Sequence, residues 1–139
     1  MNIEKFLRAE VSKMKQEEFA SKPIRTLGEV ILLLKTQPSD NTVKLDFTQD
    51  NPCGLTSFRG YYEDLALDYA EGCEPMKVGR LLSLFENALG QTFTGYKGGD
   101  FAMDNTTLVW VAPYGDTGRM LTDIKSEEGV TTIYTQEYD

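Results

Sequence analysis

Two short segments combine glycine, aromatic rings and a cation in a way that suits ligand binding better than core packing. They are Gly95-Tyr96-Lys97-Gly98-Gly99-Asp100 and Ser57-Phe58-Arg59-Gly60-Tyr61-Tyr62. Glycine is used where the backbone turns sharply or approaches another molecule closely. We therefore take these two segments as the candidate functional sites of the chain.

In the first segment, Lys97 would bind an anionic group and Tyr96 would stack on a ring, while Gly98 and Gly99 would offer backbone N–H groups. Asp100 closes the segment. The spacing does not match a P-loop, because the glycines fall between strand-like runs instead of before a helix. The alternative interpretation is a glycine-rich hairpin turn with the lysine in solvent.

In the second segment, the planar guanidinium of Arg59 would grip a phosphate or carboxylate, with Tyr61 and Tyr62 supplying ring faces. We predict that Arg59, Lys97 and Arg119 converge to make one local positive pocket. The alternative is a structural arginine whose aliphatic stem lies on a neighbouring ring and whose charge pairs with an acid.

The net charge of −8, from 22 acidic and 14 basic residues, argues against direct binding to a nucleic-acid backbone, which depends on clustered Lys and Arg. One stretch is acidic without a base: Glu63, Asp64, Asp68, Glu71 and Glu74. Its simplest interpretation is a solvated rim. The alternative is a surface that imitates nucleic acid or binds a host protein.

Catalysis has little support, so we predict that the protein is not an enzyme. The chain has no histidine, which excludes a histidine general base or triad and a Cys/His zinc site. No metal and no cofactor are expected. Cys53 and Cys73 are the only cysteines, and two cysteines do not make a disulfide framework. We expect both to be free thiols.

The longest apolar run is too short to span a bilayer, and the N-terminus has no apolar signal region. We therefore expect a soluble cytoplasmic protein with no membrane partner. The length suits a single domain, residues 1–139. Residues 1–22 are expected to form an N-terminal helical segment that is either peripheral or a site of oligomerisation, so a homo-oligomer is one alternative.

Apolar periodicity predicts helices over residues 2–20, 26–36 and 77–89. The second helix begins with the capping box Thr26-Leu27-Gly28-Glu29. The third has one apolar face and a C-terminal stop at Gly90. The residues expected to be buried on that face are Val78, Leu81, Leu82, Phe85 and Leu89.

Strands are expected over residues 43–48, 91–96, 100–103 and 107–112, and residues 55–69 form one long or two short strands. Residues 119–125 and 130–136 are expected to form a hairpin. A weak repeat aligns residues 26–31 with residues 77–82, because both begin helices. The element order predicts an α+β fold: an antiparallel sheet of about five or six strands with two or three helices packed on it.

The chain resembles a group of small bacteriophage-encoded proteins over residues 55–120. The resemblance lies in the two segments above, in Leu65-Ala66, in Val109-Trp110-Val111-Ala112 and in Tyr114-Gly115. It implies a phage accessory protein that acts in the host cytoplasm. Such proteins often counter host defence, by blocking an enzyme or by sequestering a nucleotide signal.

The residues and the resemblance together predict a protein that binds a small anionic, nucleotide-like ligand without turnover. The alternative is an acidic inhibitor or nucleic-acid mimic that occupies a basic groove of a host protein. The two functions place the important charges on different residues, so the spatial clustering of those charges distinguishes them.

Overall fold

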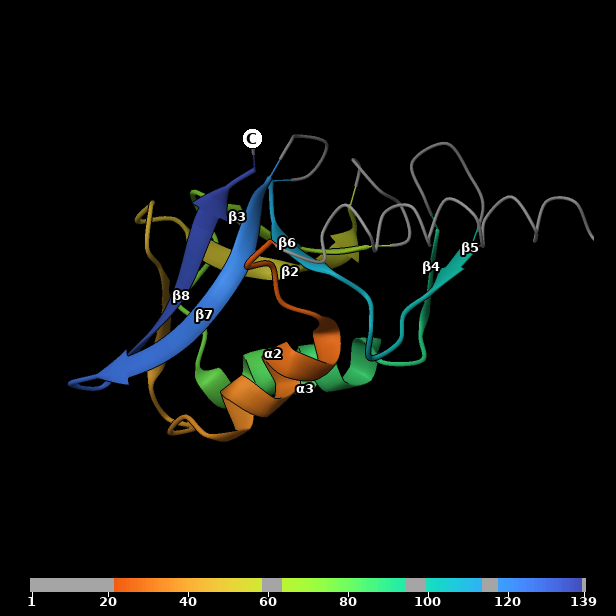
Figure 1. Cartoon of the computed structure of the whole chain (residues 1–139). Helices are drawn as coiled ribbons and strands as arrows, with labels where there is room; N and C mark the ends of the chain where they lie inside the picture. Colours follow the sequence, from red (N-terminus) through yellow and green to blue (C-terminus); the bar gives the residue numbers. More distant parts are fainter. Residues whose placement is uncertain (1–21, 59–63, 95–99, 114–117, 139) are drawn as a thin grey trace, which may run out of the picture.

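A computed structural model describes residues 22–58, 64–94, 100–113 and 118–138. The helix expected over residues 2–20 lies outside this described part, and so do residues 59–62 and 95–99 of the two glycine-containing segments. The described elements form a mixed sheet with two helices on one of its faces, below the sheet in Figure 1. The helices are α2 (Leu27–Lys35) and α3 (Val78–Ala88).

The main sheet has six strands in the order β1-β8-β7-β6-β3-β2. Their bounds are β1 Thr42–Leu45, β2 Asn51–Ser57, β3 Leu65–Ala70, β6 Val109–Val111, β7 Arg119–Glu127 and β8 Val130–Glu137. A separate ribbon consists of β4 (Thr92–Thr94) and β5 (Asp100–Ala102). The α+β class is confirmed. Residues 55–69, expected as one long or two short strands, fall in two strands, β2 and β3.

The expectation of an antiparallel sheet was wrong, because two of the strand pairs are parallel. β1 runs parallel to β8, and β3 runs parallel to β6. The β3–β6 pair requires a crossover, and the chain supplies it through α3 and the β4–β5 ribbon. Strand patterns in a sequence do not show which strands become neighbours, so this pairing was not visible there.

The two helices follow the local rules that predicted them. At the start of α2, Thr26 Oγ1 accepts a hydrogen bond from the backbone N–H of Glu29 (3.2 Å), and Glu29 Oε1 accepts one from the N–H of Thr26 (3.0 Å). Gly90 follows α3 with a φ of 81°, as a helix C-terminal stop requires.

One face of α3 is buried, but the residues on it are not all the expected ones. Val78, Leu81 and Phe85 are buried, whereas Leu82 is only half-buried and Leu89 is 40% exposed. Leu89 caps the helix in an extended conformation, with ψ of 120°, so its side chain leaves the helical face. Leu82 still packs against the main core, so the expectation is met in part at Leu82, and it was wrong at Leu89.

The two helices begin with the same backbone contacts. The first N–H groups of each helix donate to carbonyl groups just before a parallel strand, β6 for α2 and β1 for α3. The equivalent bonds are Leu27 to Thr107 (2.7 Å) with Val78 to Asn41 (3.0 Å), and Gly28 to Asn105 (3.1 Å) with Gly79 to Ser39 (3.0 Å). The weak sequence repeat thus corresponds to a structural repeat.

The strands repeat in the same way as the helices. The hairpins β2–β3 and β7–β8 each carry an irregularity in register, between Pro52 and Gly54 and between Leu121 and Asp123. The parallel pair β3–β6 corresponds to the parallel pair β1–β8. Residues 26–70 and 77–137 are therefore two copies of one helix-and-three-strand plan, called here the first and second halves.

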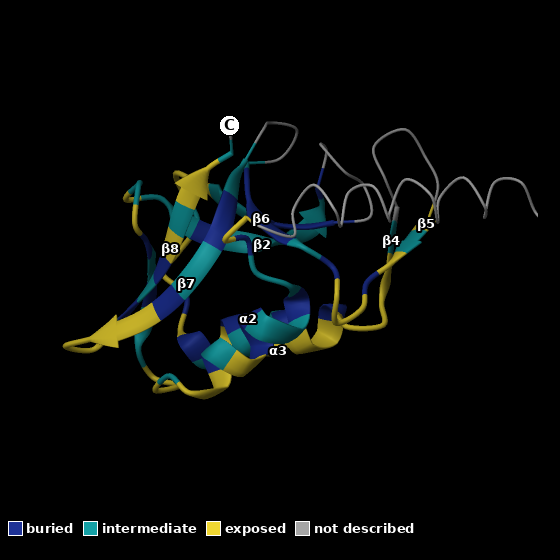
Figure 2. Ribbon diagram, in the orientation of Figure 1, coloured by how far each residue is buried: buried dark blue, intermediate teal, exposed yellow. Residues whose placement is uncertain are grey.

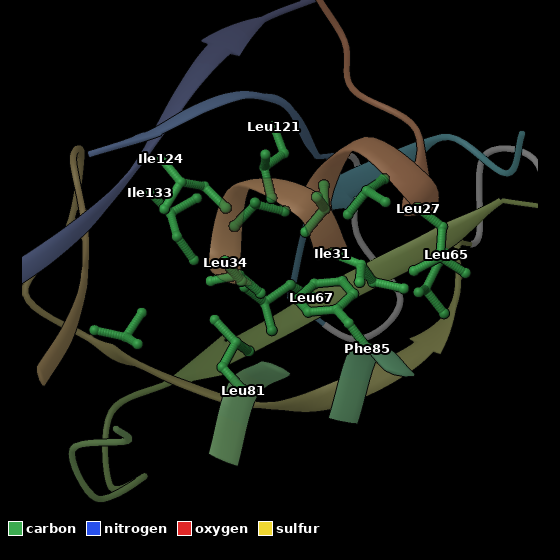
Figure 3. Close-up of a cluster of buried hydrophobic side chains, with 14 of the residues drawn as sticks. Leu27, Ile31, Leu34, Leu65, Leu67, Leu81, Phe85, Leu121, Ile124 and Ile133 are labelled. Carbon is green, nitrogen blue, oxygen red and sulfur yellow. The ribbon is translucent and has the colours of Figure 1, made fainter. Parts of the chain in front are cut away.

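The main core lies between the helices and the sheet, where buried positions from both layers face one another (Figure 2). Figure 3 shows this cluster, whose labelled residues are Leu27, Ile31, Leu34, Leu65, Leu67, Leu81, Phe85, Leu121, Ile124 and Ile133. Most of them are fully buried, and burying one leucine stabilises the fold by about 1.5–3 kcal/mol before entropy. Both halves contribute, so neither helix has a separate core.

A second, smaller cluster of buried residues surrounds Trp110, whose side chain lies on the opposite side of its strand from its core neighbours Val109 and Val111. Its members are Ile24, Phe58, Ala66, Trp110, Ala112 and Met120. Ala66 and Met120 alternate in the same way with the core residues Leu65, Leu67 and Leu121. We call this the outer cluster.

Cys53 and Cys73 are joined by a disulfide, with Cα atoms 5.6 Å apart. The expectation of free thiols was therefore wrong. β2 and β3 pair so that Asn51 lies opposite Ala70, and the turn after β3 brings the chain back over the start of β2. The side-chain amide of Asn51 also donates to the carbonyl of Cys73 (3.0 Å). Pairing between the strands, and not the spacing of the cysteines, sets this proximity.

Candidate functional site

The segment containing Arg59 begins and ends on well-packed residues. The ring of Phe58 stacks on Trp110, with centroids 4.5 Å apart and an interplanar angle of 9°. The N–H of Phe58 donates to the carbonyl of Asp64 (2.8 Å), and Trp110 Nε1 donates to Asp64 Oδ2 (2.9 Å). Residues 59–63 lie outside the described part of the chain, but Phe58 before them belongs to the outer cluster and Asp64 after them is hydrogen-bonded to Trp110 of that cluster.

The burial of Asp64 changes the interpretation of the acidic stretch. Asp64 is 1% exposed, so it is not part of a solvated rim as expected. Burying a carboxylate is costly unless hydrogen bonds and charges compensate for it, and the indole of Trp110 supplies one such bond. Asp68 is half-buried, while Glu71 and Glu74 are exposed. The described members of the stretch do not form a continuous exposed acidic face.

The segment containing Lys97 falls between β4 and β5, which pair with each other. Thr94 pairs with Asp100, and Phe93 pairs with Phe101. Both phenylalanines pack against the main core, whereas Asp100 is exposed. Tyr96, Lys97, Gly98 and Gly99 lie outside the described residues, and so do Arg59, Tyr61 and Tyr62. Their roles stay predictions from the sequence.

The strands that lead into the two segments are neighbours. β2, which leads to Phe58 and residue 59, contacts β4, which leads to residue 95. Segments that are separate in the sequence therefore start from adjacent strands. A shared site requires the strands that precede the two segments to lie near one another, and this contact meets that requirement.

The internal repeat shows where the two halves differ. The β7–β8 hairpin closes through the tight turn Glu128–Gly129, with φ of 47° and 83°, whereas the equivalent β2–β3 hairpin carries residues 59–63. Helix α2 connects to β1 through residues 36–41, whereas α3 connects to β6 through residues 89–108, which include the ribbon. The connection that contains residues 59–63 is longer in the first half, and the connection that contains residues 95–99 is longer in the second half.

Arg119 lies apart from the outer cluster. Its guanidinium stands over the ring of Phe47, which packs against the main core, with 4.8 Å from Cζ to the ring centroid. Phe58 instead belongs to the outer cluster, as does Met120, the residue after Arg119. Arg119 also donates from Nε to Thr135 Oγ1 (2.7 Å) and pairs with Glu137 (3.3 Å). We therefore treat Arg119 separately from the two segments.

The carboxyl of Glu29 has a shifted pKa. The pKa of Glu29 is lowered, chiefly because the backbone N–H of Thr26 donates to its carboxylate, and Arg25 adds a hydrogen bond and an attractive charge. The side chains of Arg25 and Glu29 pair at 3.1 Å. This shift belongs to the cap of α2 and does not mark a catalytic acid.

Sequence reasoning missed Asp64 and Trp110 as supports of the segment containing Arg59. The sequence does place Asp64 two residues after Tyr62 and sets the only tryptophan in a strand-like run. A tryptophan in a strand pairs its N–H with an acceptor when it is buried. That rule could have suggested a partner, but nothing in the sequence identifies Asp64 as that partner.

Within the part of the chain that the structure describes, no cluster of three or more Cys, Asp or Glu residues is arranged to hold a metal ion. No helix in the same part is long and apolar enough to cross a membrane. Comparison with known proteins gives no match: no family model, curated protein or solved structure matches the chain.

Proposed function

We propose that the protein binds a small anionic, nucleotide-like ligand without turning it over, through the segments that contain Arg59 and Lys97. The observation that carries this proposal is the coincidence of two independent features. The segments with ligand-binding composition are also extensions of one half of the internal repeat relative to the other. An extension that is not needed to complete the repeated fold is available for function.

The roles follow from the chemistry of the side chains. Arg59 and Lys97 take the phosphate groups, by charge-assisted hydrogen bonds. Tyr61, Tyr62 and Tyr96 offer ring faces, and Gly98 and Gly99 offer backbone N–H groups. Stacking of Phe58 on Trp110 supports this proposal, because it holds one attachment point of the Arg59 segment in place.

The burial of Asp64 favours this function over an acidic inhibitor. A mimic of nucleic acid needs a continuous run of exposed carboxylates, and Asp64 is turned into the outer cluster instead. We further propose that the protein is a phage accessory protein that counters host defence in the cytoplasm. In that reducing compartment the Cys53–Cys73 bond would be open, so the proposal requires the reduced protein to fold and to bind ligand.

A thermal-shift screen against mononucleotides and cyclic nucleotides, with and without reductant, tests the proposal. A ligand present at about 100 times its dissociation constant should add roughly 2.7 kcal/mol to the free energy of unfolding. Arg59→Ala and Lys97→Ala should each weaken binding about tenfold or more and leave the melting temperature of the free protein nearly unchanged. The matched control is Arg80→Ala, at an exposed position of α3, which should bind like wild type.

The acidic alternative is tested by the charge reversal Glu71→Lys with Glu74→Lys, two exposed positions. The nucleotide proposal expects this variant to bind as tightly as wild type, or slightly more tightly because the net charge is less negative. If no nucleotide raises the melting temperature of the oxidised or the reduced protein, the proposal is wrong.

A further inference from the structure

One end of the sheet carries polar side chains on the face that elsewhere forms the main core. Strands β1, β3, β6 and β8 run in the same direction, because the two parallel pairs are linked through the antiparallel strand β7. Their carboxyl ends therefore meet at one rim, which we call the carboxyl rim. Its residues are Asp46, Phe47, Tyr69, Arg119, Thr135 and Glu137.

Both helices begin at the opposite end of the sheet from this rim. Both helix N-termini bind carbonyl groups that precede β1 and β6, at the amino ends of the parallel strands. Thr135 alternates with the buried core residue Ile133 along β8, so its side chain faces the same side of the sheet as the core.

Arg119 contacts Thr135 and Phe47, and each of these two residues is fixed by contacts of its own. Its Nε donates to Thr135 Oγ1 (2.7 Å), and its Cζ stands 4.8 Å from the centroid of the Phe47 ring. Asp46 accepts two hydrogen bonds from Thr135, from the hydroxyl (2.7 Å) and from the backbone N–H (3.0 Å). Phe47 contacts Tyr69 edge to face. A guanidinium ordered in this way loses little further entropy when it binds an anion.

The remaining contact of Arg119 is easily exchanged. Glu137 pairs with Nη1 at 3.3 Å, but its side chain is 76% exposed, against 26% for Arg119. An exposed pair of this kind contributes little to stability. Among the described residues, no hydrogen-bond acceptor lies against Nη2 of Arg119. The ordered guanidinium of Arg119 therefore already binds one carboxylate, that of Glu137, and the Glu137 side chain is only weakly held.

We propose that Arg119 is a binding subsite for a small carboxylate, with Glu137 as its displaceable internal counter-ion. The planar fork of a guanidinium matches a carboxylate in two parallel hydrogen bonds. Asp46, bonded to the same Thr135 hydroxyl as Arg119, adds a negative charge that disfavours a dianion. This subsite is independent of the Arg59 and Lys97 segments and of the nucleotide function proposed for them.

Nuclear magnetic resonance of the full chain at pH 7 tests the subsite, with sodium acetate replacing sodium chloride at constant ionic strength. The Nε–H signal of Arg119 should shift saturably with acetate and less with inorganic phosphate. Glu137→Gln should tighten acetate binding roughly two- to fivefold, because it removes the competing carboxylate. The matched control Glu127→Gln makes the same change in net charge at an exposed position of β7 and should bind acetate like wild type.

In wild type the backbone amides of Met120 and Thr135 should shift saturably with acetate as well, and Arg119→Gln should abolish that response while the amide spectrum of the core stays the same. If that variant does not fold, the comparison of Glu137→Gln with Glu127→Gln decides the question. Equal acetate affinity in those two variants overturns the proposal, as does a shift that does not saturate. A stronger response to phosphate than to acetate overturns the assignment to a carboxylate.

Discussion

Opening the Cys53–Cys73 disulfide should destabilise the protein measurably. The bond joins residues separated by 20 positions, from the start of β2 to the connection between the two halves. Cross-linking a loop of this length removes unfolded-state entropy worth about 3 kcal/mol at 25 °C in the chain-entropy model. The double variant Cys53→Ser with Cys73→Ser and the chemically reduced wild type should lose the same amount.

Urea unfolding with and without dithiothreitol measures this loss. For a domain of this size the free energy falls by about 1–3 kcal/mol per molar urea, so a loss of about 3 kcal/mol lowers the midpoint by roughly 1–3 M. The double variant is its own control, because reductant should not move its midpoint. Alkylation of the unfolded protein should label neither cysteine before reduction and both after it.

Two outcomes would refute the reasoning about the disulfide. The first is a wild-type midpoint that does not move when reductant is added. The second is labelling of both thiols in protein that has never been reduced. Either outcome would show that the turn after β3 does not hold Cys73 against Cys53 in solution.

Three further predictions concern stability. Gly79→Ala should stabilise the protein by up to about 1 kcal/mol in urea melts, whereas Gly28→Ala should gain less or lose, because its added Cβ would lie 3.1 Å from the nearest neighbouring atom, against 3.5 Å at Gly79. Equal effects would contradict the difference in packing. Leu81→Ala should lower the free energy of unfolding by about 2–5 kcal/mol, and Leu82→Ala, at a half-buried position, by about 1 kcal/mol or less. A larger loss for Leu82→Ala than for Leu81→Ala would show that the other face of α3 is buried. The lowered pKa of Glu29 gives stability that is present above its ordinary value of 4.5 and is lost as pH falls through the folded-state value. The wild-type advantage over Glu29→Gln should therefore shrink in melts below pH 4.5, and an advantage that grows there would contradict the cap.

The sequence alone determined the features that depend on neighbours along the chain. The capping box of Thr26 and Glu29 predicted the start of α2, and the structure confirms both of its hydrogen bonds. Gly90 predicted the end of α3, and the hairpin of β7 and β8 forms around Ser126–Gly129 as expected. These features need only the conformational preferences and hydrogen bonds of residues a few positions apart.

The candidate site was predictable in composition and not in placement. Glycine, aromatic and cationic residues in one short run identified the Arg59 and Lys97 segments. The sequence could not show that β2 and β4, which lead into these segments, contact each other. It also could not show that Arg119 would contact Phe47 and Thr135, because Phe47 follows β1 and Thr135 lies in β8.

Only the tertiary structure decided the parallel pairings, the disulfide and the burial of Asp64. Each joins residues far apart in the chain: β3 with β6, Cys53 with Cys73, and Asp64 with Trp110. Such contacts form when many side chains from both halves gain burial together, and no single residue pattern encodes that gain. A carboxylate looks the same in the sequence whether it faces water or an indole N–H, and the packing of the two halves makes the difference.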